Sequence, residues 1–176
     1  ESGKLTDGPN ATVRCFSPSQ EAVYPTVRMI RWHNFDRLKQ AGGSVGLAGL
    51  ILESLPADAQ RIRVHVSGDF FNQAYFNAWM IVAEAKPDVT FYAYTKSVPF
   101  WVNRLGNIPV NFKLNASVGS RWDSLAEDAE LKSAKIVFSE IEAEALGLEI
   151  DEDDSHAWAQ DESFALLVHG TQAPGS

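Results

Sequence analysis

Cysteine is nearly absent from this chain of 176 residues, which contains one, Cys15. A single cysteine excludes an intrachain disulfide and is typical of a protein from a reducing compartment, so we expect a cytoplasmic location. Long hydrophobic runs are also missing, and the polar first residues do not resemble a secretory signal. We therefore expect no association with a membrane.

Several widespread enzyme motifs are missing as well. The sequence contains no P-loop G-x-x-x-x-G-K-[ST], no dinucleotide-binding G-x-G-x-x-G and no zinc-binding H-E-x-x-H. Each motif supplies backbone or side-chain groups that its chemistry requires. ATPases of the P-loop type, Rossmann dehydrogenases and zincins are therefore not expected.

Basic residues are absent from the C-terminal part of the chain. Residues 140–176 contain ten acidic residues and no Lys or Arg, whereas residues 1–139 contain fifteen basic and thirteen acidic residues. The net charge of −8 thus belongs to the C-terminal region, and the main body is close to neutral. This distribution excludes a general basic coat for nucleic acid but is compatible with a phosphate-binding groove.

The chain has a repeated pattern of apolar strands followed by helices. We predict strands at residues 62–67, 89–95, 110–118, 134–138 and 164–169, and helices at residues 20–40, 44–55, 72–85, 97–105, 123–131 and 140–146. Strands separated by helices need crossover connections and usually lie parallel. The sequence predicts a single α/β domain over residues 1–176, with a parallel sheet or an incomplete (β/α) barrel. Residues 1–18 would form an N-terminal loop and residues 149–162 an acidic loop.

Polar side chains follow or end several of these strands. Parallel α/β sheets bind ligands at the C-terminal ends of their strands, so these side chains are the candidate site. The predicted catalytic residues are Asp69, Lys96 and His169. The predicted substrate-binding residues are Ser67, Thr95, Asn115, Ser117 and Arg121.

For three of these residues, the side-chain chemistry is compatible with more than one role. Asp69 could bind a metal, act as a base or hold a ribose hydroxyl, or it could accept N–H bonds at the start of the next helix. Lys96 could bind phosphate or carboxylate, or act as an amine of lowered pKa, or it could be a surface lysine. Arg121 could clamp an anion or pair with one of the many acidic residues.

Two histidines are interpreted as structural. His65 alternates with Val64 and Val66, which is typical of a satisfied core histidine in a strand. His156 follows a run of acidic residues, and a solvated acidic loop is the favoured interpretation over a metal cluster.

Several segments, in order, resemble one known family. They include Thr6-Asp7-Gly8, Arg14-Cys15-Phe16, Val64-His65-Val66-Ser67-Gly68-Asp69-Phe70-Phe71, Phe91-Tyr92-Ala93-Tyr94-Thr95-Lys96-Ser97 and His169-Gly170-Thr171-Gln172. Over nearly the whole chain the sequence is similar to the bacteriophage gene-product-eighty-eight family. This resemblance implies a phage-related protein of the host-cell cytoplasm and no particular reaction.

A weaker similarity links the chain to phage proteins that resemble radical S-adenosylmethionine enzymes. In those proteins a cysteine cluster precedes strands whose ends correspond to Thr95-Lys96 and Ala116-Ser117-Val118. Members of the gene-product-eighty-eight family have further cysteines before the position of Cys15, and this chain begins after them. The resemblance implies Cys15 as one ligand of an iron–sulfur cluster with S-adenosylmethionine, if upstream residues or a second subunit supply the other thiolates.

Two functions therefore remain open. One is an enzyme that acts on a nucleotide or nucleic-acid substrate at the strand C-termini, with radical-type or transferase-type chemistry. The alternative is a non-catalytic phage protein that binds a host or virion partner through its acidic C-terminal region.

Overall fold

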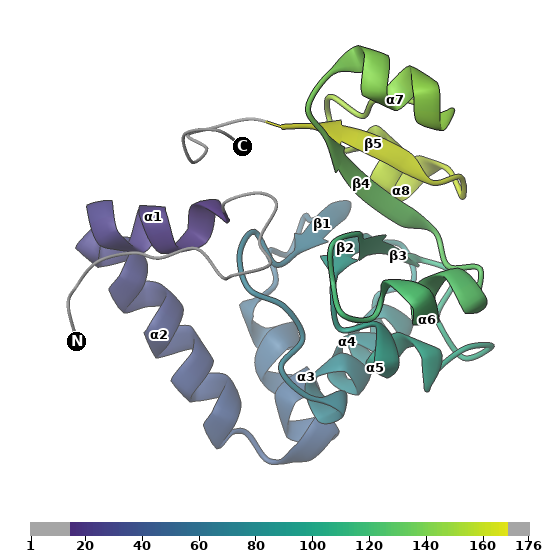
Figure 1. Cartoon of the computed structure of the whole chain (residues 1–176). Helices are drawn as coiled ribbons and strands as arrows, with labels where there is room; N and C mark the ends of the chain where they lie inside the picture. Colours follow the sequence, from purple (N-terminus) through teal and green to yellow (C-terminus); the bar gives the residue numbers. More distant parts are fainter. Residues whose placement is uncertain (1–14, 169–176) are drawn as a thin grey trace. The chain divides into compact units, whose positions relative to one another are not determined.

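The computed structural model describes residues 15–168, and these residues belong to two compact units (Figure 1). One unit consists of residues 1–40 and 169–176, of which 15–40 are described, and the other of residues 41–168. Each unit is considered by itself, and a single domain over the whole chain stays a prediction. His169 and most of the predicted loop 1–18 lie outside the described residues.

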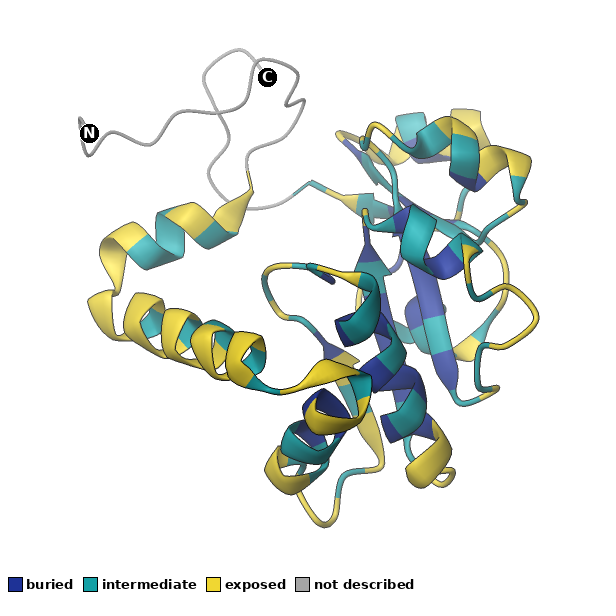
Figure 2. Ribbon diagram, turned by 90° about the horizontal axis from the view of Figure 1, so that it is seen from below, coloured by how far each residue is buried: buried dark blue, intermediate teal, exposed yellow. Residues whose placement is uncertain are grey.

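The described part of the first unit is a pair of helices, α1 (Phe16–Val23) and α2 (Pro25–Gln40). The single helix predicted over residues 20–40 is interrupted because Pro25 lacks an N–H and holds Tyr24 in an extended conformation. Arg31 joins the two helices, donating from Nη2 to Gln20 Oε1 at 2.7 Å and from Nη1 to the Ser17 carbonyl at 3.2 Å. Neither helix contains a buried residue (Figure 2).

The second unit is built on a sheet of five parallel strands. Its elements are α3 (Gly43–Ser54), β1 (Arg61–Val64), α4 (Gln73–Ala85), β2 (Thr90–Thr95), α5 (Val98–Val102), β3 (Phe112–Ser117), α6 (Asp123–Asp128), β4 (Ser133–Val137), α7 (Glu140–Leu146), α8 (Ser155–Ala159) and β5 (Phe164–Leu167). The strands follow one another in chain order and curl into a half-barrel (Figure 1). The predicted α/β fold with a parallel, incomplete barrel is confirmed.

The strands are staggered between β3 and β4. The last two residues of β3, Ala116 and Ser117, pair with the first two of β4, Ser133 and Ala134. β4 and β5 then continue together beyond the point where β3 ends. The C-terminal ends of β1, β2 and β3 are therefore the ones that can share a site.

One face of the sheet is covered by helices α3 and α4. Phe91 of β2 and Phe112 of β3 stack with their ring centroids 6.0 Å apart, and Trp79 of α4 packs edge-on to Phe91. These rings are buried and account for part of the core (Figure 2). Aromatic side chains of this size contribute much of the burial that holds a small domain together.

The opposite face of the sheet is covered by α8, a helix that the sequence did not predict. Ala157 of α8 is fully buried and packs with Tyr92, Ala134 and Phe164 from three strands. This helix lies inside the predicted acidic loop 149–162, so that region contains a helix and a core contact as well as loop. None of the helices within residues 15–168 has the length and apolar character needed to cross a bilayer.

Two helix starts differ in how they are capped. The N-cap of α3 is Gly42, and no side chain forms a capping hydrogen bond there. The N-cap of α4 is Asn72, whose Oδ1 accepts the Tyr75 N–H at 2.8 Å. Amide and carboxylate side chains at this position satisfy N–H groups that a helix leaves unpaired.

Candidate functional site

The candidate site lies at the C-terminal ends of β1 and β2, and we call it the edge site. It comprises the side chains of His65, Asp69, Thr95 and Lys96, and Ser67 lies in the turn between His65 and Asp69. Its centre is the carboxylate of Asp69. Oδ1 accepts from Thr95 Oγ1 at 2.6 Å and from the Phe70 N–H at 2.7 Å, and Oδ2 accepts from the Lys96 N–H at 2.7 Å.

These bonds change the interpretation of Asp69. The alternative role predicted from sequence, capping the following helix, is filled by Asn72 instead. Asp69 joins the turn after β1 to the end of β2. The joint is reinforced by Ser97, whose Oγ donates to the Phe70 carbonyl at 2.8 Å and whose N–H donates to Thr95 Oγ1 at 2.9 Å. The edge site is therefore held rigidly between two strand ends.

Lys96 extends this connection to β3. Its Nζ lies 3.0 Å from the Gly119 carbonyl oxygen, 3.1 Å from that of Val118 and 3.4 Å from that of Ser117. The residue is exposed, and its ammonium group, which has three N–H donors, contacts three carbonyl oxygens. Gly119 has a φ of +92°, a backbone conformation that residues with a Cβ rarely adopt, so the loop after β3 depends on glycine.

The loop after β3 is held by Asp123 at the start of α6. Its carboxylate accepts the N–H groups of Gly119 and Ser120, both at 2.9 Å. Burial opposes the charged form, but these hydrogen bonds and the charge of Lys96 keep the pKa of Asp123 below its usual range. Beside it, a small cavity of about 70 Å³ is lined in part by Ser117 and Asp123.

His65 is the feature of this site that sequence reasoning missed. It does not continue β1 as predicted, because its φ of +66° places it in the left-handed region that favours glycine. The strand thus ends at Val64 rather than at Ser67. No sequence signal marks this change, since His65 fits the alternating pattern of a strand.

The imidazole of His65 is neutral and partly satisfied. Its Nε2 lies 3.0 Å from Tyr75 Oη, and its ring packs edge-on to Phe70 at 4.7 Å. Its Nδ1 is buried and has no hydrogen-bond partner among the residues that the structure describes. Burial lowers the pKa of His65 to about 4, although the charge of Asp69 acts in the opposite direction.

The other predicted site residues are dispersed. Asn115 is fully buried on the opposite face of the sheet, where Nδ2 donates to the carbonyls of Ala93 at 3.2 Å and Ala157 at 3.1 Å. Arg121 is exposed, with its guanidinium 4.9 Å from the ring centre of Trp122. Asn115 thus holds α8 in place, and Arg121 lies on the loop that Lys96 contacts.

Cys15 belongs to the first unit. It is exposed and occupies the N-cap position of α1. Within residues 15–168, no group of three or more His, Cys, Asp or Glu side chains is arranged to hold a metal ion.

One segment matches the sequence pattern of a catalytic motif but lacks the secondary structure that the motif requires. Gly42-Gly43-Ser44-Val45-Gly46 has the letters G-x-S-x-G of a nucleophile elbow. That motif requires a strand before the turn, whereas here it follows α2 and begins α3. The serine is therefore not a candidate nucleophile.

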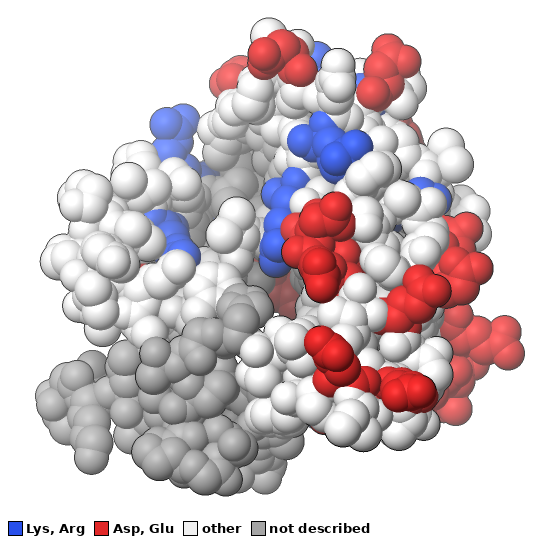
Figure 3. Space-filling view, turned by 90° about the horizontal axis from the view of Figure 1, so that it is seen from above, with Lys and Arg blue, Asp and Glu red and all other residues white. Residues whose placement is uncertain are grey.

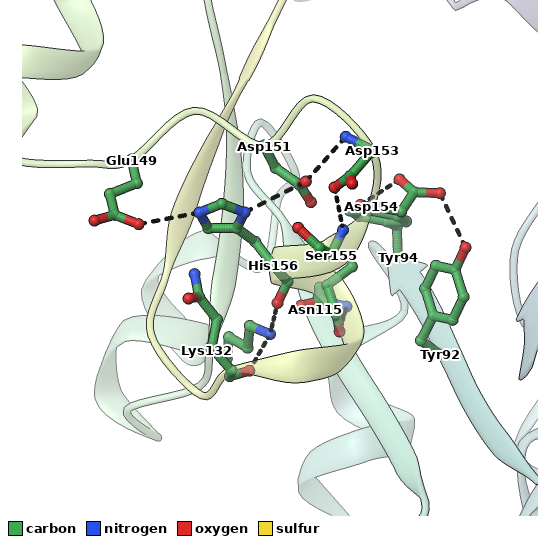
Figure 4. A network of polar contacts seen from close by, with 12 residues as sticks. Tyr92, Tyr94, Asn115, Lys132, Glu149, Asp151, Asp153, Asp154, Ser155 and His156 are labelled. Atoms are coloured by element: carbon green, nitrogen blue, oxygen red, sulfur yellow. Dashed lines mark hydrogen bonds and ion pairs between the residues drawn. The ribbon is translucent and has the colours of Figure 1, made fainter.

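The acidic segment is more structured than a solvated loop. The side chain of Asp151 is fully buried, and its Oδ1 lies 3.4 Å from His156 Nδ1, while Glu149 Oε2 lies 3.1 Å from Nε2 of the same ring (Figure 4). Asp154 accepts hydrogen bonds from Tyr92 and Tyr94. The predicted solvated loop at His156 is therefore replaced by a network of polar contacts.

Comparison with known proteins places the chain in a family. The family model described as Gene product 88 matches residues 9–176. The chain belongs to the Gene product 88 family. It is similar to the Gene 88 protein of Mycobacterium phage L5, with 31% identity over 127 residues that cover 63% of this chain and 53% of the phage protein.

A second relative from a mycobacteriophage gives the same result. The Gene 88 protein of Mycobacterium phage D29 is 28% identical over 127 residues. The chain spans about half the length of these two curated Gene product 88 proteins. No solved structure matches it. The family resemblance is confirmed, whereas the similarity to radical S-adenosylmethionine proteins is not supported by these comparisons and stays a prediction.

Proposed function

We propose that this Gene product 88 protein is an enzyme that binds a nucleotide or the end of a nucleic acid at the edge site. The observation that carries the proposal is His65, a non-glycine residue in a left-handed conformation with a buried ring nitrogen that has no partner among the described residues. Backbone strain and unsatisfied buried polar atoms are enriched at functional sites. His65 also lies directly after a parallel strand, where such sheets bind ligands.

The edge site offers complementary groups to a phosphate-bearing ligand. Asp69 is a positioning residue, because its carboxylate oxygens already accept three donors. Lys96 and Arg121 present exposed positive charge on neighbouring loops. When Nε2–H of His65 donates to Tyr75 Oη, Nδ1 carries a lone pair and can accept a hydrogen bond from a ligand hydroxyl or amino group.

The predicted iron–sulfur chemistry does not fit the thiols of this chain alone. A cluster needs three or four thiolates, and the sequence has one cysteine, which is exposed in the first unit. The proposal for S-adenosylmethionine chemistry therefore depends on cysteines outside this sequence. Iron analysis of the complete reading frame, purified without oxygen, tests it: iron bound at several thiols supports the cluster, and iron-free protein after reconstitution contradicts it.

Nucleotide binding tests the edge site directly. The probes are ATP, AMP and a short single-stranded oligonucleotide, titrated calorimetrically into the wild-type chain. His65→Gln and Lys96→Ala should each weaken binding by about tenfold, the loss expected for one hydrogen bond or ion contact to a ligand. His33→Gln and Lys86→Ala, which change exposed residues that are not part of the edge site, are matched controls that should bind like the wild type. Equal affinity of His65→Gln and the wild type would contradict the proposal.

A second candidate function is supported by the surface around α7. Ile141 is 77% exposed in a helix whose other residues include Glu140 and Glu144. Acidic side chains gather on the right of Figure 3, the side on which α7 lies in Figure 1. An exposed apolar side chain within an acidic surface suits a protein partner with a basic, partly apolar patch.

The two functions respond differently to substitution. Deleting residues 149–162 would remove the buried Ala157 and Asp151 and so unfold the second unit, which makes that deletion uninformative. Ile141→Ser is the better variant, with Val110→Ser, at an 88% exposed residue, as its control. Loss of the phage phenotype in Ile141→Ser and its retention in His65→Gln would favour the partner-binding function. Mass spectrometry of phage particles then shows whether the protein is a virion component.

A further inference from the structure

A second constellation of hydrogen-bond donors lies on the α8-covered face of the sheet. Arg63 of β1 and Tyr92 of β2 are paired in the strand register, and Tyr94 follows two residues later on the same face. All three donate to one carboxylate: Arg63 Nη1 lies 2.8 Å and Tyr92 Oη 3.0 Å from Asp154 Oδ2, and Tyr94 Oη lies 2.9 Å from Oδ1. We call these three donors the clamp (Figure 4 shows the two tyrosines with Asp154).

The clamp has the chemistry of an anion-binding site. Burial, and then the hydrogen bond and charge of Asp154, raise the pKa of Tyr92 to about 12 and raise that of Tyr94 further above its usual range. Both hydroxyls therefore stay protonated and donate at physiological pH. A guanidinium with two hydroxyl donors offers an oxyanion several charge-assisted hydrogen bonds.

A second guanidinium and a second carboxylate lie near the clamp: the charge of Arg61 acts on Tyr92, and that of Asp151 acts on Tyr94. Arg61 lies two residues before Arg63 on β1, and its guanidinium stacks 3.4 Å from the ring centre of Trp158 in α8. Alternate residues of a strand face the same side, so Arg61 and Arg63 both lie on the sheet face that carries the clamp. A phosphate group offers more oxygen acceptors to these donors than a carboxylate does.

Asp154 occupies the clamp from a strained and accessible position. Its φ is +65°, in the left-handed region, at the N-cap of α8. The Asp154 side chain is 26% exposed and that of Arg63 is 37% exposed, so solvent reaches both groups.

We propose that Arg63, Tyr92 and Tyr94 form a second binding site, for the phosphate group of a ligand, and that Asp154 occupies this site as an internal competitor. The site lies on the sheet face opposite Thr95 and is independent of the edge site. A ligand that binds only when Asp154 is displaced has its apparent affinity reduced by the fraction of molecules in which the clamp is open. Removing the Asp154 carboxylate should therefore increase affinity for phosphate.

The test uses inorganic phosphate with Asp154→Gly in the full chain. Glycine adopts the same φ without strain, so this change removes the carboxylate and keeps the turn. Isothermal calorimetry should show phosphate binding at least about tenfold tighter in Asp154→Gly than in the wild type, as expected when an internal competitor is removed. Adding Arg63→Met should abolish the gain. Equal affinities of wild type and Asp154→Gly, or a gain that survives Arg63→Met, would overturn the proposal.

Further arms of the experiment identify the ligand and guard against unfolding. AMP in place of inorganic phosphate distinguishes a nucleotide from free phosphate, and acetate at the same concentrations measures the preference over a carboxylate. If Asp154→Gly does not fold, Asp154→Asn takes its place, because asparagine also tolerates a left-handed backbone.

In the wild type, high phosphate should shift the ring resonances of Tyr92 and Tyr94, and Arg63→Met should not show this shift. A wild type without the shift would also contradict the proposal.

Discussion

At the scale of single residues, this protein places two non-glycine side chains in left-handed backbone next to polar networks. His65 follows β1 and Asp154 precedes α8, with φ values of +66° and +65°. Each adopts a conformation that is uncommon for residues with a Cβ. The edge site and the clamp are thus each associated with a residue in left-handed backbone.

Burial of His65 makes stability depend on pH. Its pKa falls from 6.5 to about 4 in the native state, so between these values the unfolded chain binds a proton that the native protein does not. The free energy of unfolding should therefore decrease as the pH falls from 6.5 toward 4. Chemical denaturation at several pH values should show a slope that is smaller in His65→Gln, with a total difference of up to about 3 kcal/mol.

The exposed histidine in α2 provides the control for this measurement. His33→Gln replaces an exposed histidine by the same residue as His65→Gln does, so it measures what the loss of any one histidine does to the slope. A His65→Gln protein with an unchanged slope would show that His65 titrates normally in the native state.

Removing the charge of Asp154 should lower the pKa of Tyr92. Burial and the adjacent Asp154 hydrogen bond and charge raise the pKa of Tyr92 to about 12. Asp154→Asn removes the negative charge, so the phenol should ionise at lower pH. Phenolate absorbance at rising pH measures this change, with Asp154→Asn/Tyr92→Phe as the matched background for the other tyrosines. Identical titration curves for wild type and Asp154→Asn would contradict the hydrogen bond between these residues.

At the scale of secondary structure elements, local chemistry explains most helix ends. Ser139 and Gly147 bound α7: the Ser139 Oγ accepts the Glu142 N–H at 3.2 Å, and Gly147 closes the helix with a φ of +67°. The sequence predicts a helix at residues 140–146 that Gly147 ends, and the structure adds the cap at Ser139. The helix α4 is likewise predictable from its apolar pattern and from Asn72.

Capping offers a direct comparison between two helix starts. Asn72→Ala should lower the free energy of unfolding by about 1 kcal/mol, because the Tyr75 N–H loses its side-chain acceptor. Ser44→Ala, at the start of α3, should change stability much less, because no side chain caps that helix. Denaturant unfolding of both variants measures the difference. A larger effect for Ser44→Ala would show that the caps are assigned to the wrong residues.

The elements that the sequence did not predict depend on contacts between distant residues. Five residues of α8 form a helix because Ala157 packs among three strands and because Lys132 Nζ donates to the His156 and Gln160 carbonyls at 2.5 and 2.6 Å. Composition alone shows only an acidic segment there. Likewise β1 ends at Val64 because His65 turns toward Tyr75, a contact that the alternating pattern does not show.

At the scale of the whole unit, parallel strands in chain order bring some predicted site residues together and separate others. Asp69, Thr95 and Lys96 meet because β1 and β2 are neighbours in register. Ala116 is the register partner of Thr95, so these two side chains share a face of the sheet. Asn115 precedes Ala116 in the strand and therefore faces the other side. The sequence therefore predicts the region of the site. Which face of the sheet each side chain lies on depends on the strand registers, which only the structure shows.

The central claim is that the edge site binds a nucleotide. Backbone amide chemical-shift mapping of the isotope-labelled wild-type chain, titrated with ATP, tests it most directly. We expect the largest shifts at residues 65–70, at residues 95–97 and in the loop after β3 at residues 118–121. Shifts confined to α7, or none up to millimolar ATP, a concentration at which even weak specific sites are occupied, would contradict the claim.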